Sequence, residues 1–412
     1  METTRNHIVS AFAVAFLFSH HCVVAKDAGK DYLDQQISKV ALAEINSTGT
    51  PSIQIAIGLG NKVIYESAFG MADVENNVAA TSASRYRTAS VAKWFTATAA
   101  MKLANSNVLN LDVPIQTYCP QYPKKQWDIT ARQLITHTSG IRHYRDYEKE
   151  LAEISSPEDK RNLKIKALEE SVSSYTRYSD VVSPLQTFKE DDLLFKPGTD
   201  WQYSSYGYRV LACVLQGASG KSYVDTMKSV LFEPANMSHT VPDDAWAIIP
   251  DRVSGYQINK GELRRADLRD VSENLPAGGY LSTASDLIRF AMAFDMNMLP
   301  EATKQLMTST VLVELDDDSE PSWRDAMPQE DKYGYGVMLL SKYSNGMLGH
   351  SGRQAGGSAI LVLFPQEDLS IAVMSNAKGW NGYLNFVMKI KAITDKKVQA
   401  AKSLNKTRNK AE

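Results

Sequence analysis

Strand-like runs lie at both ends of this chain, and they constrain the fold more than any other feature. Two short β-rich runs near the start, SIQIAIGLG and KVIYESAFG, meet around Gly60 and Asn61, which is typical of a hairpin. Three more runs, YGYGVMLLS, SAILVLFP and LSIAVMSN, follow one another near the end. Because both ends contribute strands, we predict one antiparallel sheet that is closed by the two termini and interrupted by an insertion.

The insertion between these β-rich ends is helical in pattern. Apolar residues recur at helical spacing in 93–104, 131–136, 206–217, 223–231 and 284–295, and also near the two ends of the chain, in 31–44 and 383–393. The sequence therefore predicts an α/β or α+β architecture with an antiparallel sheet, terminal helices and a mostly helical inserted subdomain. We expect one domain over 26–395, with the sheet part in 26–85 and 332–395 and the helical part in 86–331. The active site is expected where these parts meet.

Two segments have the composition of peripheral structure. Residues 145–189 are rich in Glu, Lys and Ser, which is typical of an exposed helical excursion. Residues 396–412 are lysine-rich and contain few apolar side chains, so we expect a disordered tail.

The first residues predict an export signal. A short polar start with Arg5 is followed by an apolar run over 8–18 and by small residues at Val23 and Ala25. We therefore expect a signal peptide over 1–25 and an exported, periplasmic or secreted protein without strong membrane association after cleavage. The alternative is an uncleaved N-terminal segment that anchors the protein in a membrane.

The overall composition is that of a soluble globular protein, with 43% hydrophobic and 22% charged residues. A formal net charge of -2 at pH 7 argues against nucleic acid as the main partner, so we expect a small-molecule or peptide substrate. The His, Cys and acidic residues show no zinc-like spacing, so we expect neither a metal nor another cofactor. The sequence leaves homo-oligomerisation undecided.

Cysteine usage is sparse. Cys22 would leave with the signal peptide, while Cys119 and Cys213 remain. In an oxidising compartment these two are able to form one disulfide, but their number does not suggest a disulfide framework. We favour two separate buried thiols, and neither is flanked by the residues that a nucleophilic cysteine needs.

The pattern S-x-x-K occurs at Ser90/Lys93, Ser375/Lys378 and Ser403/Lys406. Only Ser90 opens an apolar helix, where unpaired backbone N–H groups and the positive end of the helix dipole stabilise an oxyanion. Ser90 and Lys93 also share one helix face, so their side chains are able to touch. The alternative interpretation is a helix-capping serine beside a surface lysine.

Further polar segments follow Ser90 in a definite order. Tyr203-Ser204-Ser205 stands just before a helical pattern, and His350-Ser351-Gly352 stands just before a strand-like run. Between Ser90 and Tyr203, the stretch LITHTSGIRHY places His137 in a turn. We expect His137 to hold a loop through hydrogen bonds rather than to take part in catalysis.

These motifs, with the stretches HTSGIRHY, LLFKPGTDWQYSSYGY and AGGYLSTASDL, resemble the serine β-lactamase and penicillin-binding-protein superfamily, in particular its class C and D-alanyl-D-alanine carboxypeptidase branch. In that family S-x-x-K, Y-x-N and then K-T-G or H-x-G occur in this order. The resemblance spans roughly 53–376 and implies a β-lactamase/transpeptidase-like fold.

The resemblance also implies a role for each motif residue. Ser90 would be the acylated nucleophile, and either Lys93 or a Tyr203 phenolate held by Lys93 would take its proton. The backbone N–H groups of Ser90 and Arg353 would form the oxyanion hole, and His350 would shape the substrate side of the site. We therefore predict a serine hydrolase that works through an acyl-enzyme on Ser90.

Two departures from the family pattern bear on the substrate. Ser205 stands where the family most often has asparagine, so the side-chain amide that would contact the substrate is missing. His350 replaces the lysine of K-T-G and removes a permanent positive charge, and it is expected to add an inflection near pH 6.5 to the activity profile.

The substrate-binding residues implied by the resemblance are Ser205, Ser351, Gly352 and Arg353. With this set we expect a peptidase, a D-alanyl carboxypeptidase-like enzyme, an amidase or an esterase, with weak β-lactam hydrolysis at most. The alternative is a binding or self-assembling scaffold protein with little turnover.

Overall fold

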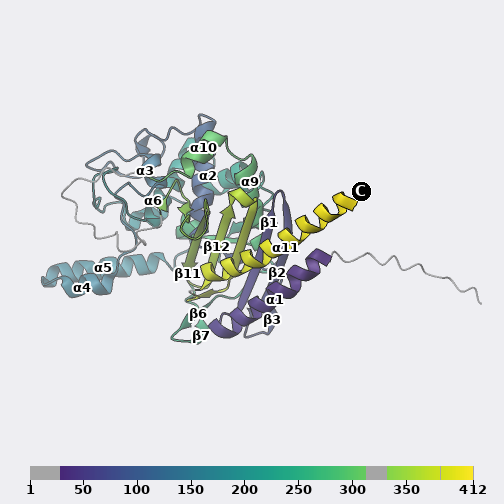
Figure 1. The fold of residues 1–412 in the computed structure, drawn as a ribbon. Helices are drawn as coiled ribbons and strands as arrows, with labels where there is room; N and C mark the ends of the chain where they lie inside the picture. The colour runs from purple at the N-terminus through teal and green to yellow at the C-terminus, as the bar shows by residue number, and fades with distance from the viewer. Residues whose placement is uncertain (1–27, 312–331, 381, 412) are drawn as a thin grey trace, which may run out of the picture.

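A mixed sheet-and-helix architecture is seen in the computed structural model, which describes residues 28–311, 332–380 and 382–411 (Figure 1). Within these residues, eight strands form one antiparallel sheet in the order β3-β2-β1-β13-β12-β11-β10-β9. The strands are β1 (Ser52–Leu59), β2 (Lys62–Asp73), β3 (Val78–Ala79), β9 (Lys332–Tyr333), β10 (Met338–Leu339), β11 (Leu348–Gln354), β12 (Gly357–Phe364) and β13 (Leu369–Ser375). The pairing of β1 with β13 joins the two ends of the chain, which confirms the predicted fold class.

The two terminal helices cover one face of this sheet. Figure 1 shows α1 (Ala28–Thr48) and α11 (Tyr383–Ala411) side by side across it. Apolar side chains of both helices form a core with the strands below them; its members include Leu33, Ile37, Ala41, Ile55, Ile371, Phe386 and Ile390. Burial of this face orders both ends of the domain.

The predicted disordered tail at 396–412 is contradicted over most of its length, because α11 continues as helix to Ala411. The reason is intrinsic propensity: the segment VQAAKSLNK is rich in Ala, Lys, Gln and Leu, which favour helix even where few side chains are buried. The predicted signal peptide over 1–25 lies outside the described residues.

The inserted part packs on the opposite face of the sheet. Its helices are α2 (Val91–Asn105), α3 (Ala131–Ile135), α6 (Ser205–Ser219), α7 (Tyr223–Met227), α8 (Leu275–Gly278), α9 (Ala284–Met296) and α10 (Glu301–Met307), with the short turns η1 (Ile115–Thr117), η2 (Ser183–Thr187), η3 (Lys228–Phe232) and η4 (Ser272–Asn274). A further turn, η5 (Pro365–Glu367), joins β12 to β13 in the sheet part.

Helix α2 is buried on every side, and the rings of Trp94 and Phe95 meet Phe290 of α9 edge-on. A helix buried on all sides explains the unbroken apolar composition that follows Ser90.

Two small sheets lie where the main sheet meets the helical part. One contains β14 (Ala377–Lys378), β6 (Tyr256–Asn259) and β7 (Glu262–Arg265), and the other contains β4 (Tyr86–Arg87), β8 (Tyr280–Ser282) and β5 (Val241–Pro242). Strand β4 leads directly into α2, so this junction fixes the position of Ser90.

The excursion predicted at 145–189 begins with two helices, α4 (Tyr147–Glu153) and α5 (Pro157–Ser173), which project from the helical part in Figure 1. Ser156 caps α5 by accepting a hydrogen bond from the Asp159 amide, and Pro157 occupies the first turn. Exposed apolar side chains at Ile165 and Leu168 show that one face of α5 is uncovered in the described chain.

Cys119 and Cys213 form a disulfide, so the prediction of two separate buried thiols is wrong. Their separation of 94 residues carried no signal of pairing. The contact arises because α6 packs closely on the loop after η1: a β-carbon on Gly217 would lie 1.7 Å from the carbonyl oxygen of Tyr118. This approach brings Cys213, one turn earlier on α6, opposite Cys119.

Among the described residues, no helix combines the length and the apolarity needed to cross a bilayer.

Candidate active site

Ser90 lies at the N-terminus of α2, as the sequence predicted. The residue before it, Ala89, has a left-handed backbone with φ +44°, which an alanine adopts only when its surroundings enforce it. Thr88 enforces it in part, because its amide and its hydroxyl both donate to the carbonyl of Tyr280. The turn between β4 and α2 is therefore tight, and it presents the Ser90 side chain at the helix end.

Lys93 lies one turn into α2 and points back to Ser90. Its Nζ is 3.2 Å from Ser90 Oγ, 3.0 Å from Ser205 Oγ and 3.0 Å from the carbonyl oxygen of Ala277. The residue is fully buried, and no carboxylate among the described residues pairs with it. Burial, helped by the nearby positive charge of Arg209, holds the pKa of Lys93 well below its ordinary value. Lys93 is thus a candidate base rather than the surface lysine of the alternative interpretation.

Tyr203 completes the polar group around Ser90. Its hydroxyl is hydrogen-bonded to the Ser90 side chain, and Lys93 Nζ lies 4.8 Å from the centre of its ring. Burial raises the pKa of Tyr203, and the hydrogen bond from Ser90 only partly offsets this. The resting side chain is therefore an uncharged phenol at neutral pH.

Two histidines hold the segment that carries Tyr203. The amide of Ser204 donates to His137 Nδ1 at 3.0 Å, and the amide of Ser205 donates to His143 Nδ1 at 3.2 Å. The Ser204 hydroxyl in turn caps α6 by accepting from the Gly207 amide. The structure thus gives His137 the loop-holding hydrogen bond that the sequence suggested.

The edge of β11 passes close to the nucleophile. A β-carbon on Gly352 would lie 2.2 Å from the backbone nitrogen of Ser90, a distance that no side chain tolerates. Because Gly352 has no side chain, β11 reaches the N-terminus of α2. This contact brings together the backbone amides of Ser90 and Arg353, which are the expected oxyanion donors. Ser351 is held from the other side, since its Oγ accepts from the Tyr383 hydroxyl at 3.2 Å.

His350 lies beneath this edge and not on the surface of the cleft. It is 1% exposed, its Nε2 accepts from the Tyr333 hydroxyl at 3.1 Å, and its Nδ1 donates to the carbonyl of Ser351 at 2.7 Å. Burial and the charge of Lys93 lower the pKa of His350 to about 3. An inflection from His350 near pH 6.5 is therefore no longer expected, because a histidine that is fully desolvated does not ionise there.

A cleft of about 470 Å³ opens over Ser90. Most of the predicted site residues line it: Ser90, Tyr203, Ser205, Ser351, Gly352 and Arg353. Further lining residues that sequence reasoning missed are Tyr144, Arg269, Glu273, Asn274, Lys378 and Tyr383. The volume suits a small ligand or a short peptide segment.

Arg209 is the most informative of the residues that the sequence analysis did not select. It is 2% exposed, and its guanidinium pairs with Glu273 on the cleft wall, with 3.1 Å between Nη2 and Oε1. Its position in the apolar run YGYRVLACV of α6 was the available signal, because a charge inside such a run is usually paired.

Among the described residues, no group of three His, Cys, Asp or Glu side chains has the arrangement of a metal site.

The fold, with a serine and a lysine on the first turn of a buried helix beside the edge of an antiparallel sheet, is that of penicillin-binding proteins and serine β-lactamases. The Beta-lactamase family model matches residues 31–387, so the chain belongs to that family. The proteins of this superfamily are generally serine hydrolases.

Individual relatives agree with this assignment. The chain is 29% identical over 399 residues to the serine beta-lactamase-like protein LACTB, mitochondrial, of Mus musculus, covering 80% of this chain and 72% of that protein. Its fold resembles the octameric penicillin-binding protein homologue from Pyrococcus abyssi, with a TM-score of 0.67 and 21% identity over 84% of this chain and 74% of the other. It also resembles EstCE1, described as a hydrolase with promiscuous acyltransferase activity, with a TM-score of 0.70 and 18% identity over 88% and 98% of the two chains.

Proposed function

We propose that this protein is a serine hydrolase that cleaves an amide or ester through an acyl-enzyme on Ser90. The observation that carries the proposal is the 3.2 Å contact between Ser90 Oγ and the fully buried Lys93 Nζ. A serine hydroxyl is inert unless a neighbouring group takes its proton, and a lysine whose pKa is lowered by burial is such a group.

The hydrogen bonds around Lys93 favour this amine as the base for acylation. A neutral amine has two donors and one lone pair. The three polar neighbours of Lys93 Nζ are Ser90 Oγ, Ser205 Oγ and the Ala277 carbonyl. When the amine is neutral, its two N–H groups serve Ser205 and Ala277, and its lone pair is able to accept the Ser90 proton during attack. Tyr203 is less suited to begin the reaction as a phenolate, because burial raises its pKa.

The proposed acylation conserves every proton. Ser90 Oγ attacks the substrate carbonyl carbon while its proton passes to Lys93, and the amides of Ser90 and Arg353 stabilise the oxyanion. The Tyr203 phenol donates a proton to the leaving nitrogen or oxygen as its bond to carbon breaks, and the proton on Lys93 restores the phenol. Water then attacks the ester carbonyl and gives its proton to the same pair. The pair passes this proton to Ser90 Oγ as the bond between Ser90 Oγ and the acyl carbon breaks, so the acid product leaves and the Ser90 hydroxyl is restored.

The surroundings of His350 favour peptide or ester substrates over β-lactams. Because its pKa is lowered to about 3, His350 carries no positive charge at neutral pH to face a substrate carboxylate. Ser205 Oγ accepts from Lys93, so its hydroxyl replaces only part of the missing asparagine amide. We therefore propose peptidase, amidase or esterase activity with weak β-lactam hydrolysis at most.

A fluorophosphonate probe read by intact mass and peptide mapping tests this function. One adduct on the Ser90 peptide is expected, and none in Ser90→Ala. Ser403→Ala, at another S-x-x-K, is the matched control and is expected to label fully. Failure of every ester, thioester, β-lactam and fluorophosphonate to acylate Ser90 would refute the proposal. Turnover of p-nitrophenyl esters, a cephalosporin and D-Ala-D-Ala peptides, compared side by side, then ranks the substrate classes.

The second candidate function is a self-assembling scaffold with little turnover. It draws on α4 and α5, which project from the body and carry exposed Leu168 and Val172, and on the octameric state of the Pyrococcus abyssi homologue. Sedimentation velocity of the full chain and of a variant lacking the excursion tests it. A defined assembly that is lost with the excursion supports it, and a monomer that turns over rapidly contradicts it.

We also propose that the protein works in an oxidising compartment after export. The Cys119–Cys213 disulfide supports this, since such bonds are rare in reducing compartments. The LACTB relatives carry the description mitochondrial, so export from a cell and import into an organelle both need testing. N-terminal sequencing of the mature protein from fractionated cells distinguishes them: a start after Ala25 in an exported fraction supports the signal peptide, and retention of residue 1 contradicts it.

A further inference from the structure

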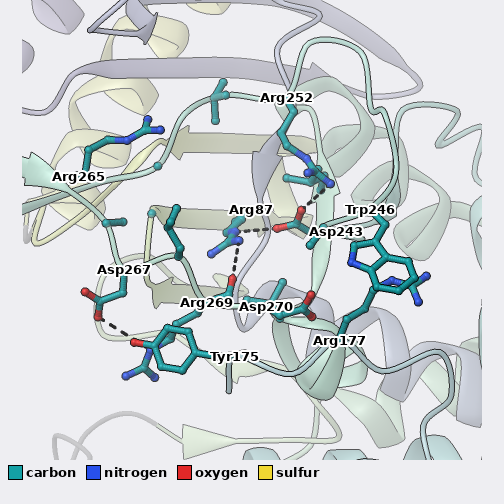
Figure 2. A pocket seen from close by; sticks show the side chains of 18 residues that line it. Arg87, Tyr175, Arg177, Asp243, Trp246, Arg252, Arg265, Asp267, Arg269 and Asp270 are labelled. Carbon is teal, nitrogen blue, oxygen red and sulfur yellow. Dashed lines mark hydrogen bonds and ion pairs between the residues drawn. The ribbon is translucent and has the colours of Figure 1, made fainter. Parts of the chain in front are cut away.

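A second cavity of about 520 Å³ adjoins the cleft over Ser90 (Figure 2). Its walls come from β4, from the hairpin of β6 and β7, and from the loops around Trp246 and Asp270. Asp267, Arg269, Asp270 and Val271 line both cavities. One short segment is therefore the common wall between the catalytic cleft and this second cavity, which we call the arginine pocket.

The arginine pocket is lined by many charged side chains. Five arginines line it: Arg87, Arg177, Arg252, Arg265 and Arg269. Asp243, the central carboxylate in Figure 2, is shared by two of them, at 2.7 Å from Arg87 Nε and 3.0 Å from Arg252 Nη2. Asp270 is buried and accepts from the amide of Ser272 at 2.8 Å. Arg177 and Arg265 are paired as well, with Asp244 at 2.7 Å and with Glu75 at 3.1 Å. Of the five arginines, Arg269 therefore has the loosest ion pair, at 4.0 Å from Asp267.

Two arginines retain capacity to bind an anion. Arg252 Nε is buried without a hydrogen-bond partner among the described residues. The Arg269 side chain is 51% exposed, and its Nε lies 4.0 Å from Asp267, which is beyond hydrogen-bond distance. A buried donor without a partner is unfavourable, and a carboxylate in the pocket would satisfy it once the Arg252 guanidinium turned toward the cavity.

The rim of the pocket is aromatic. Trp246 is 79% exposed, and the Arg177 guanidinium lies 4.4 Å from the centre of its ring, so the two are stacked. Tyr175 on the opposite side is 53% exposed. Exposed aromatic rings beside a cationic site are suited to a ligand that carries an apolar or aromatic group next to its negative charge.

Arg87 connects the pocket to the catalytic edge. Its Nη1 donates to the carbonyl of Ala355 at 2.8 Å, and its Nη2 donates to the carbonyl of Arg269 at 3.3 Å. Ala355 lies in the turn between β11 and β12, two residues after Arg353. A chain bound along β11 would therefore reach the arginine pocket at the end of that strand.

We propose that the arginine pocket is a subsite that binds a carboxylate on the part of the substrate remote from the scissile bond. The enzyme would therefore prefer acyl or peptide chains that carry an aromatic or apolar group next to a carboxylate. This inference rests on the proposed function for the identity of the ligand as a substrate. The binding of the anion itself does not depend on catalysis.

Calorimetric titration of Ser90→Ala protein tests the subsite without turnover. The probes are N-succinyl-phenylalanine amide, which carries a carboxylate, and N-acetyl-phenylalanine amide, which does not. The first is expected to bind about tenfold more tightly, and Arg252→Gln in the same background is expected to remove most of that difference, because a charge-assisted hydrogen bond is lost. Equal affinity for the two probes, or an unchanged ratio in Arg252→Gln, would overturn the proposal.

Two further variants separate the pocket from general electrostatics and from folding. Arg264→Gln removes one charge from the same hairpin at a residue that does not line the pocket, so the affinity ratio should persist. Arg269→Gln changes an exposed side chain without breaking a buried pair, and should lower the ratio as Arg252→Gln does. If Arg264→Gln lowers the ratio equally, the preference is a surface effect and the subsite is refuted.

A catalytic comparison distinguishes the two proposals. For p-nitrophenyl esters of matched neutral and carboxylate-bearing acyl chains, the ratio of kcat/KM values should fall about tenfold in Arg252→Gln. Absence of any acylation of Ser90 refutes the proposed function but leaves the titration result standing. Normal acylation with no preference for the anionic chain refutes only the subsite.

Discussion

A β-carbon on Gly352 would lie 2.2 Å from the backbone nitrogen of Ser90, so β11 reaches the nucleophile only because residue 352 has no side chain. Gly352→Ala is expected to push the strand away from Ser90 and to misplace the oxyanion donors. Loss of one such donor lowers kcat by about 10² to 10³. The measurement is steady-state hydrolysis of a p-nitrophenyl ester, with thermal unfolding as the check on folding.

Gly207→Ala is the matched control for that substitution. Its β-carbon would lie 3.5 Å from Ser204 Oγ, an ordinary contact, and the position is helical. Activity close to wild type is expected there. If Gly352→Ala hydrolyses esters as fast as Gly207→Ala does, the Ser90 amide is not an oxyanion donor.

The pH dependence of kcat/KM reports the base in the free enzyme. A base acts only when deprotonated, and burial holds the pKa of Lys93 well below its ordinary value. We therefore expect kcat/KM to rise with pH and to reach its plateau well below pH 10.5. No further inflection is expected near pH 6.5, because the pKa of His350 is lowered to about 3.

Lys93→Met tests the assignment of that inflection. The variant keeps the length of the side chain and removes the amine, so acylation should slow by about 10² to 10⁴ and the ascending limb should disappear. Stopped-flow acylation with a chromogenic ester measures both. An unchanged ascending limb in Lys93→Met would assign the inflection to another group.

Arg209 and Glu273 are expected to move the pH profile in opposite directions. The positive charge of Arg209 helps to lower the pKa of Lys93, so Arg209→Met should shift the ascending limb to higher pH. Glu273→Gln removes the carboxylate that balances Arg209, at 3.1 Å, and should shift it to lower pH. Shifts in the same direction, or lost activity without any shift, would mean that the pair only supports the fold.

The arrangement of the sheet and the core of the site were predictable because each depends on local pattern. The strand runs at both ends required a shared sheet, and the apolar helix after Ser90 required a buried α2. Tyr203 stands just before helix α6, and His350 lies in strand β11. At such positions the helix or strand sets the direction of the side chain. Tyr203 and His350 were selected because their order along the chain after Ser90 resembles that of the family's motifs.

Features that depend on distant contacts were not predictable. The disulfide joins residues 94 apart, and its geometry follows from the close approach of Gly217 to Tyr118. Burial of His350 follows from packing beside Tyr333, and no local pattern around residue 350 indicated a lowered pKa. The helix beyond residue 396 follows from helix propensity, whereas the lysine-rich composition was interpreted as disorder.

Buried His350 also makes the protein sensitive to acid. Its pKa is lowered to about 3 in the folded state from 6.5, so the unfolded state binds more protons over that range and stability is lost as the pH falls from about 6.5 towards 3. Between pH 7 and pH 5 this amounts to about 2 kcal/mol of unfolding free energy from His350 alone.

Urea unfolding at both pH values tests this. The unfolding free energy lost between pH 7 and pH 5 should be smaller by that amount in His350→Gln than in wild type. Equal losses in the two proteins would show that His350 is protonated in the folded state at pH 5.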